Sequence, residues 1–378
     1  MEGTVAAPRA GFLRAERCYW LDWLRFGAAF IVMVGHLRGG HFADYADLYP
    51  QYHSPLIATL FAFTRIGPEA VLLFFVLSGF LVGGRSAQRA MEGSFQTLPY
   101  AIDRITRIYV PLVPALALTA LIGVVQGWHV SFTTFLGNLA GVQGVFCWSF
   151  GGNAPLWSLS YEIWFYILCG GVLAMTSRSG PAGRLLSWAA ILGSFCIFTK
   201  LEAVYLFCWL LGAFGYVVAA PFSRKTGLVV ALFLIGAGVS CSQMGSDSAS
   251  VNVSGFRSFL PSRSVSWLLL SFGFVVLVKI AAHWKPRARP WQILEKAGGM
   301  PAAFSYTLYL THFSLGQLWE YEFHGRSKAL DFRSLSTFFL EICFCMVAAW
   351  MLYFLFERNT GRIRKWAVNC LRGKGCRT

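Results

Sequence analysis

The chain has 378 residues, of which 56% are hydrophobic, 16% aromatic and 13% charged, and its formal net charge is +15. A soluble domain carries about 25% charged residues, so this composition excludes a water-soluble globule, a disordered chain and a nucleic-acid-binding domain as the main body of the protein. We predict an all-α, polytopic protein whose main partner is a lipid bilayer.

A membrane-spanning helix needs about 20 mostly apolar residues. In chain order, the ten candidate spans are 19–37, 67–84, 108–126, 156–176, 186–199, 203–220, 227–241, 264–282, 301–319 and 336–356. The fifth and seventh of them are short. Two further apolar stretches, 55–64 and 132–147, are too short to span and are expected to be re-entrant or interfacial.

The distribution of basic residues predicts the topology. With ten spans, the side that carries both termini holds 22 lysines and arginines and the other side holds 8. Because cytoplasmic loops are enriched in Lys and Arg, both termini are expected in the cytoplasm and the protein in the inner (cytoplasmic) membrane. The predicted domains are a cytoplasmic tail at 1–18, a transmembrane domain at 19–356 and a basic cytoplasmic tail at 357–378.

The first predicted span contains three ionisable residues, Asp22, Arg25 and His36. Ionisable groups inside a membrane are costly and mark functional sites. Arg25 and His36 are eleven residues apart, close to three helical turns, so they share one face at a separation of about 16 Å. Two structural alternatives remain open: Arg25 pairs with Asp22 at i,i+3, and His36 meets headgroups or water at the membrane interface.

Two arginines precede the third span. Arg104 and Arg107 lie at i,i+3 on one helical face at the expected cytoplasmic surface. Guanidinium groups bind phosphates in a fork geometry, so this pair is a candidate site for a phosphorylated cytosolic ligand. The alternative is that both arginines anchor the topology by contacting lipid headgroups.

Polar residues also mark the second and fourth spans. Ser158, Ser160 and Glu162 place two hydroxyls and a carboxylate near the start of the fourth span, where Glu162 is too deep to be an ordinary solvated residue. It is a candidate for orienting an imidazole or binding a hydroxylated acceptor. Glu69 begins the second span, where a carboxylate favours the positive end of the helix dipole.

The ninth span carries a polar stripe. Ser305, Tyr309 and His312 lie at i,i+4,i+7 on one helical face. Core packing explains Tyr309 as well as a functional role does, and His312 is the more informative residue. The ten cysteines lack metal-ligand spacing, so no metal site is expected. A disulfide between Cys147 and Cys241 remains an open alternative.

Five segments lie along the chain in a characteristic order: Leu21-Asp-Trp-Leu-Arg25 through His36, Phe74-Phe-Val-Leu-Ser-Gly-Phe80, Arg104-x-x-Arg107, Trp157-Ser-Leu-Ser-Tyr-Glu162 and Ser305-Tyr-Thr-Leu-Tyr-Leu-Thr-His312. Together they resemble the acyltransferase 3 family of bacterial integral-membrane O-acyltransferases. One departure is Leu72, which stands where many members have an aspartate, so that the nearby acid is Glu69 instead.

The resemblance implies transfer of an acyl group, acetyl by default, from cytosolic acyl-CoA to a hydroxyl of a carbohydrate. Exopolysaccharide, lipopolysaccharide O-antigen and a secreted oligosaccharide are the acceptors it suggests. On this hypothesis Arg25, Arg104 and Arg107 bind the CoA phosphates. His36 is a general base or forms an acyl-histidine intermediate.

The remaining roles are less sharply defined by the sequence. Glu162 would orient the imidazole or the sugar, and the oxyanion donor would be one of Ser160, Tyr161 and Tyr309. The further substrate-binding candidates are Glu69, Trp157, Tyr309 and His312. Two alternative functions remain: a transporter that uses His36 and Glu162 as proton-relay groups, and a catalytically inert scaffold.

Overall fold

The computed structural model describes residues 18–176, 180–218, 223–244, 262–322 and 326–371. Within these ranges the chain is helical and contains no strand, only two isolated bridges. The all-α prediction is therefore confirmed. Most of the predicted N-terminal tail, 1–18, lies outside the described residues.

Fifteen α-helices follow one another in these ranges. Between them lie the 3-10 turns Tyr45–Asp47, Pro50–Tyr52, Phe150–Gly152, Ala154–Leu156 and Glu357–Asn359, and a π-helix, η3, at Gly79–Gly84. The helices are α1 (Tyr19–His41), α2 (Pro55–Thr64), α3 (Gly67–Ser78), α4 (Arg85–Met91), α5 (Thr97–Val125), α6 (Phe132–Leu139), α7 (Trp157–Ala174), α8 (Pro181–Phe198), α9 (Ala203–Val217), α10 (Arg224–Met244), α11 (Arg263–His283), α12 (Arg289–Ala297), α13 (Gly299–Glu322), α14 (Phe332–Leu355) and α15 (Thr360–Leu371).

Each of the ten predicted spans coincides with one of these helices. Among the described residues, eight helical stretches are long and apolar enough to cross a membrane, and each of them overlaps one predicted span. The other two predicted spans are α9, which has 15 residues, and the 24-residue α13 with its polar stripe. The two spans predicted to be short are longer as helices, 18 residues in α8 and 21 in α10. The protein is therefore a multi-pass membrane protein.

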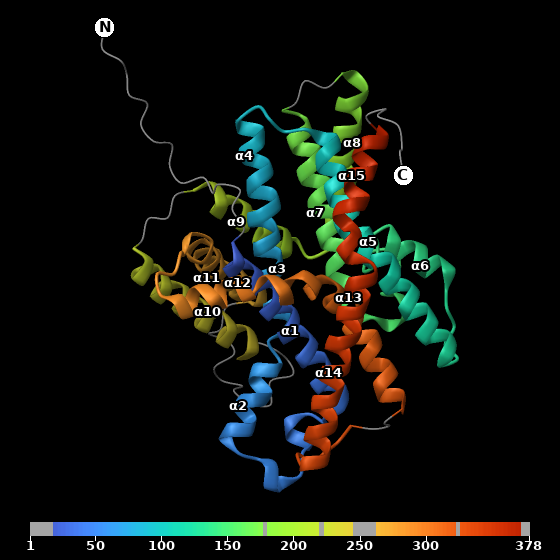
Figure 1. The fold of residues 1–378 in the computed structure, drawn as a ribbon, viewed down its shortest axis with the longest axis vertical. Helices are drawn as coiled ribbons and strands as arrows, with labels where there is room; N and C mark the ends of the chain where they lie inside the picture. The colour runs from blue at the N-terminus through green and yellow to red at the C-terminus, as the bar shows by residue number, and fades with distance from the viewer. Residues whose placement is uncertain (1–17, 177–179, 219–222, 245–261, 323–325, 372–378) are drawn as a thin grey trace.

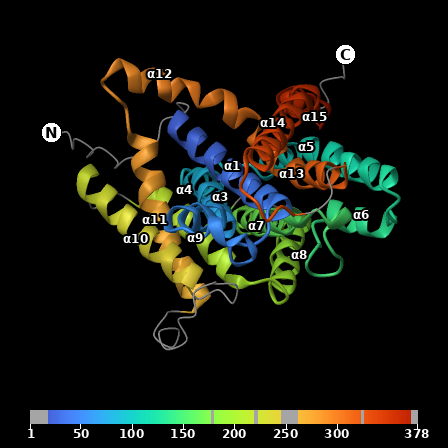
Figure 2. The same ribbon diagram turned by 90° about the horizontal axis from the view of Figure 1, so that it is seen from below.

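The helices form a bundle around α1, α3 and α7 (Figures 1 and 2). α10 and α11 pack together on one flank, while α5 and α6 lie on the opposite flank (Figure 2). Within the bundle α1 packs against α3 and α13, and α3 packs against α9. A buried aromatic cluster joins α3, α7, α9 and α11 through the rings of Phe75, Phe165, Tyr205 and Trp267.

The predicted C-terminal tail is not a free tail in its described part. Residues 357–371 form a 3-10 turn and α15, which packs against α5 (Figure 1). The Glu357 carboxylate is buried and accepts hydrogen bonds from Arg107 at 2.7 Å and from the Thr307 hydroxyl at 2.6 Å. Because a buried carboxylate must be paired, these contacts hold the segment against the bundle.

The two short apolar stretches form short helices. The stretch 55–64 is the 10-residue α2, and 132–147 comprises the 8-residue α6 followed by turns. Cys147 and Cys241 are both free, so the open alternative of a disulfide between them is wrong. Cys147 lies beside Gly137 of α6, and its Sγ accepts a long hydrogen bond from Asn138.

The continuous helical run of α3 and η3 approaches α9 through glycines. A Cβ at Gly79 would overlap the Trp209 carbonyl oxygen, and a Cβ at Gly212 would overlap the Val76 carbonyl oxygen. Small residues at such positions allow helix backbones to pack closely in a bilayer. This contact fixes α3, which carries residues of both cavities described below.

We expect Gly79→Ala to lower the free energy of unfolding by about 1–3 kcal/mol, because the new methyl group forces the two backbones apart. The matched control is Gly27→Ala on α1, where a Cβ would meet nothing within 4 Å. Thermal unfolding of the detergent-solubilised protein measures both. Equal melting temperatures for the two variants would contradict close packing at Gly79.

Candidate active site

A cavity of about 420 Å³ lies between α1, α3, α5, α7 and α13. The structure brings together three predicted phosphate-binding residues here, Arg25, Arg104 and Arg107, although they come from two different helices. Two carboxylates, Asp22 and Glu162, share the same lining. Arg85 lines it as well, and the remaining wall is mainly apolar and aromatic, with the serines Ser78, Ser158 and Ser305.

Each of the three arginines has a carboxylate partner. Arg25 lies 3.1 Å from Asp22, Arg107 lies 2.7 Å from Glu357, and Arg104 contacts Asp103. The Arg25–Asp22 pair was foreseen as a structural alternative, and it coexists with the position of Arg25 in the cavity wall. These pairs fix the guanidinium groups in place.

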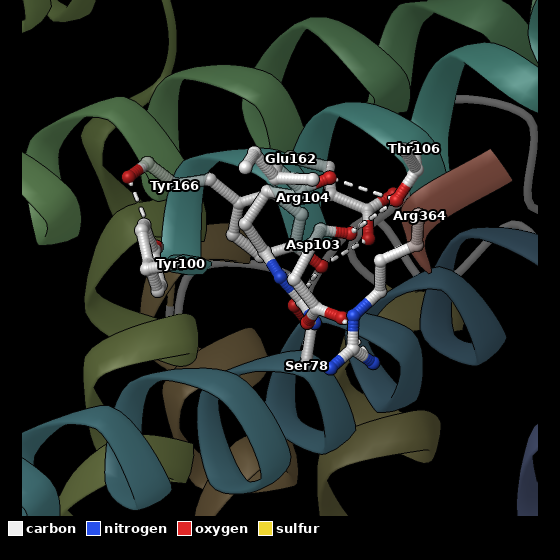
Figure 3. Close-up of polar contacts among 9 residues, drawn as sticks. Ser78, Tyr100, Asp103, Arg104, Thr106, Glu162, Tyr166 and Arg364 are labelled. Atoms are coloured by element: carbon white, nitrogen blue, oxygen red, sulfur yellow. Dashed lines mark hydrogen bonds and ion pairs between the residues drawn. The ribbon is translucent and has the colours of Figure 1, made fainter. Parts of the chain in front are cut away.

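A chain of hydrogen bonds supports the same wall (Figure 3). The Tyr166 hydroxyl donates to Glu162 at 2.5 Å, so its oxygen accepts the Ser78 hydroxyl at 3.0 Å. Trp209 Nε1 in turn donates to Ser78 Oγ at 3.1 Å. The guanidinium of Arg104 lies over the Tyr166 ring, 5.2 Å from its centroid. Glu162 is thus oriented by Tyr166 and faces the arginines.

A second basic chamber of about 500 Å³ adjoins this cavity and shares Arg85 and Arg104 with it. Arg89 and Arg364 also line it, and Arg364 forms an ion pair with Asp103 at 3.1 Å (Figure 3). Four arginines against one aspartate make the chamber strongly positive. Together the two spaces form a basic entrance followed by a largely apolar interior.

His36 lies in a different cavity. This third space has a volume of about 300 Å³ and lies between the end of α1, the starts of α3 and α11 and the end of α10. Glu69 lines it as well, which places that predicted substrate-binding residue beside His36. Arg25 and His36 are therefore on opposite sides of a partition instead of in one continuous cavity.

α3 forms part of the partition. Glu69 lines the cavity of His36 and Val71 lines the arginine cavity, and because residues two positions apart point to nearly opposite sides of a helix, the two cavities contact different faces of α3. Phe74 lines the arginine cavity and meets Tyr309 edge to face, with ring centroids 5.4 Å apart.

His36 and His312 form a pair at the partition. His36 Nδ1 lies 3.0 Å from His312 Nε2, and the rings stack with centroids 5.2 Å apart. His312 is fully buried, and its Nδ1 lies 3.0 Å from the Leu308 carbonyl oxygen. The two histidines are 276 residues apart in sequence.

The hydrogen-bond partners fix the proton positions of the neutral pair. A carbonyl oxygen only accepts, so His312 Nδ1 carries a proton and His312 Nε2 is the acceptor. His36 Nδ1 then donates to it, which leaves His36 Nε2 without a proton. Burial without a carboxylate contact disfavours an imidazolium at His312. His36 thus presents a free lone pair at Nε2.

A family model described as an acyltransferase domain matches residues 19–358. The chain belongs to the acyltransferase 3 family. No curated protein and no solved structure matches it. The matched range contains both cavities, the histidine pair and the buried Glu357, so the site lies within the family domain.

Three predicted site residues of this acyltransferase lie away from both cavities. The Ser160 hydroxyl donates to the Gly141 carbonyl oxygen at 2.7 Å, and the Tyr161 hydroxyl accepts from the backbone amide of Glu202 at 3.0 Å. Trp157 packs edge to face against Tyr161 in the aromatic core. In a helix, positions 158 and 162 share a face that position 160 does not, which explains why Glu162 reaches the cavity and Ser160 does not.

Of the three oxyanion-donor candidates, Tyr309 alone lines a cavity. Its hydroxyl lies 2.7 Å from Ser158 Oγ, and its ring centroid lies 6.0 Å from that of His312. Ser158 lines the same cavity. These two hydroxyls stand on the arginine side of the partition, next to the histidine pair.

Sequence reasoning missed several residues of the acyltransferase site. One of them carried a usable signal: Tyr166 follows Glu162 at i+4, so it lies on the helical face of a polar residue already identified. Glu357 gave none, because its partner Arg107 is 250 residues away. The contact of His36 with His312 was likewise invisible in the sequence.

Proposed function

We propose that this membrane acyltransferase moves an acyl group, acetyl by default, from cytosolic acyl-CoA to a carbohydrate hydroxyl on the other side of the inner membrane. The observation that carries the proposal is the placement of two cavities against different faces of α3. One adjoins a chamber lined by arginines, and the other contains a histidine with a free lone pair.

The orientation follows from charge. In the predicted topology, one side of the membrane carries 22 basic residues, and the basic chamber with its four arginines (the arginine chamber) lies on that side. The other side carries 8 basic residues, and the cavity of His36 lies there. Because basic loops stay in the cytoplasm, the arginine chamber faces the cytosol, and acyl-CoA enters there. The acceptor then approaches His36 from the outer face.

The donor fits the shape and charge of the inner spaces. The CoA phosphates would bind Arg85, Arg104 and Arg107, whose fork geometry suits phosphate oxygens. The uncharged pantetheine arm would extend along the apolar part of the cavity toward Tyr309. The thioester would then lie beside Tyr309, whose ring centroid is 6.0 Å from that of His312.

The reaction needs one base and one oxyanion donor. His36 Nε2 takes the proton of the acceptor hydroxyl as its oxygen attacks the thioester carbonyl carbon. The carbonyl oxygen gains negative charge, which the hydroxyl of Tyr309 or Ser158 stabilises by donating a hydrogen bond. The carbon–sulfur bond then breaks, and the CoA thiolate takes the proton from the His36 imidazolium. The products are the ester and free CoA.

Direct transfer of this kind excludes a covalent enzyme intermediate. Rapid denaturation at neutral pH of the enzyme with radiolabelled acetyl-CoA, before acceptor is added, should leave no label on the protein; acid is avoided because it hydrolyses an acyl-imidazole. Stable label on His36 would instead establish the acyl-histidine route that the same lone pair permits.

Replacing Arg104 by Ala should raise the KM for acetyl-CoA by about 10–100-fold, because hydrogen bonds between charged groups contribute about 1.5–3 kcal/mol. The KM for the acceptor should change little. The assay is steady-state transfer by the purified full chain at varied acetyl-CoA and at varied acceptor concentrations.

Arg358→Ala is the matched control, since Arg358 lies over the Phe354 ring and lines neither the arginine chamber nor the cavity of His36. An Arg104 effect confined to the acceptor would contradict the donor assignment. Solute uptake by proteoliposomes without any requirement for acyl-CoA would favour a transporter instead.

A further inference from the structure

The cavity of His36 has an unusual charge. Three arginines, Arg38, Arg65 and Arg263, line it together with one carboxylate, Glu69. The exposed Asp44 lies 3.7 Å from Arg38, too far for a hydrogen bond. Among the described residues that line or adjoin the cavity, the three arginines outnumber the two acids. A cleft lined mainly by one sign of charge concentrates ligands of the opposite charge.

Arg38 is the decisive residue. It is 9% exposed, and its Nε and Nη1 atoms are buried with no hydrogen-bond partner among the described residues. Its guanidinium carbon lies 5.1 Å above the Phe61 ring, which holds the side chain in position. Leaving buried charged donors unsatisfied costs free energy, so the site is built for a group that is absent from the protein itself.

The acid of the same cavity is also incompletely bonded. Glu69 Oε1 accepts from Ser242 at 2.7 Å and from Gln243 at 2.9 Å, whereas Oε2 is buried and has no partner in the described part of the chain. Glu69 is 3% exposed. Arg38 and Glu69, which line the same cavity, thus keep buried polar atoms without a hydrogen bond in the described part of the chain: Nε and Nη1 of Arg38, of which Nη1 has the long ion contact with Asp44, and Oε2 of Glu69.

From these groups we infer that the acceptor is an acidic carbohydrate, whose carboxylate or phosphate binds Arg38 and Arg263 while a neighbouring hydroxyl reaches His36. This inference rests on the proposed function and names its acceptor class. The volume of about 300 Å³ is at the lower end for small-ligand sites and suits a single sugar unit. A further hydroxyl of that unit would donate to Glu69 Oε2.

Binding of defined probes tests the anion site directly. The full chain in detergent, saturated with CoA so that the inner arginines are occupied, is titrated with D-glucuronate, D-glucose 6-phosphate, and the neutral methyl ester of glucuronate. A rise in melting temperature reports binding. We expect one or both anions to bind at least tenfold more tightly than the ester, and the preferred anion identifies carboxylate or phosphate as the recognised group.

Substitutions then locate the site. Arg38→Gln and Arg263→Gln should each weaken binding of the preferred anion by about tenfold or more, and Arg38→Lys should restore part of it. The matched control is Arg224→Gln: Arg224 and Arg263 both lie 4.3 Å from a tryptophan ring centroid, but Arg224 is at the other end of the α10–α11 pair, outside this cavity. Equal binding of anion and ester, no binding of either anion, or no effect of Arg38→Gln and Arg263→Gln would each overturn the inference.

Acyl transfer separates this inference from the proposed function. Acidic and carboxyl-reduced forms of one oligosaccharide are compared as acceptors from acetyl-CoA. If the acidic form is preferred and Arg38→Gln removes that preference, both proposals are supported. If His36-dependent transfer is equal for both forms and Arg38→Gln does not change it, the acidic acceptor alone is overturned. If anions bind in a way that depends on Arg38 but no acceptor is acylated, the proposed function alone is overturned.

Discussion

Replacing His36 by Ala should lower acyl transfer by about 10²–10⁴-fold, the usual contribution of a positioned general base. His36 Nε2 is the unprotonated nitrogen that the histidine pair presents to the acceptor cavity. Without it the acceptor hydroxyl must attack with its proton still bound. Mass spectrometry of acylated glycans from cells that carry each variant measures the loss.

The control for His36→Ala is His283→Ala. His283 is exposed at the end of α11, and its Nδ1 lies 2.8 Å from the Lys279 carbonyl oxygen, away from both cavities. Both variants should insert into the membrane and unfold at temperatures close to that of the parent protein. Wild-type transfer by folded His36→Ala would remove this residue from the mechanism.

The second large effect is expected at His312, which acts as a positioning residue. Its Nε2 accepts the hydrogen bond from His36 Nδ1 and so keeps the proton off His36 Nε2. His312→Phe removes that acceptor, and the imidazole of His36 is then free to take the wrong tautomer. We expect kcat to fall by about 10²–10³-fold, with little change in the KM for acetyl-CoA.

Two further measurements distinguish positioning from simple packing. His312→Gln, whose amide oxygen can reach the place of Nε2, should recover much of the activity, although it fills less of the ring volume than Phe does. In the His36→Ala background, His312→Phe should cost nothing more, because the two residues act as a unit. Additive losses, or a Gln variant as inactive as the Phe variant, would refute the positioning role.

Much of the fold could be predicted from the sequence. Each predicted span coincides with a helix, because a run of about 20 apolar residues in a bilayer must satisfy its backbone hydrogen bonds locally. Polar residues on one helical face, such as Arg104 with Arg107, were also identifiable, since helical periodicity fixes which neighbours share a face. These are local properties of the chain.

The site itself depended on contacts between distant segments. Ser158 and Ser160 are equally plausible in sequence, and only the rotation of α7 in the bundle turns Ser158 and Glu162 toward the cavity and Ser160 toward Gly141. Arg38, counted in sequence only as one of the basic residues outside the cytoplasm, is a buried cavity residue because α2 and the ends of α10 and α11 close around it.

The sequence by itself determined that this protein is a helical membrane acyltransferase, together with several of the polar residues that line its cavities. The tertiary structure decided that Arg25 and His36 face different cavities, and that His36 is paired with His312 from α13. The reason is physical: hydrophobic patterning sets where a helix lies and which face is polar. Close packing between helices, as at Gly79 and Trp209, sets which polar faces meet.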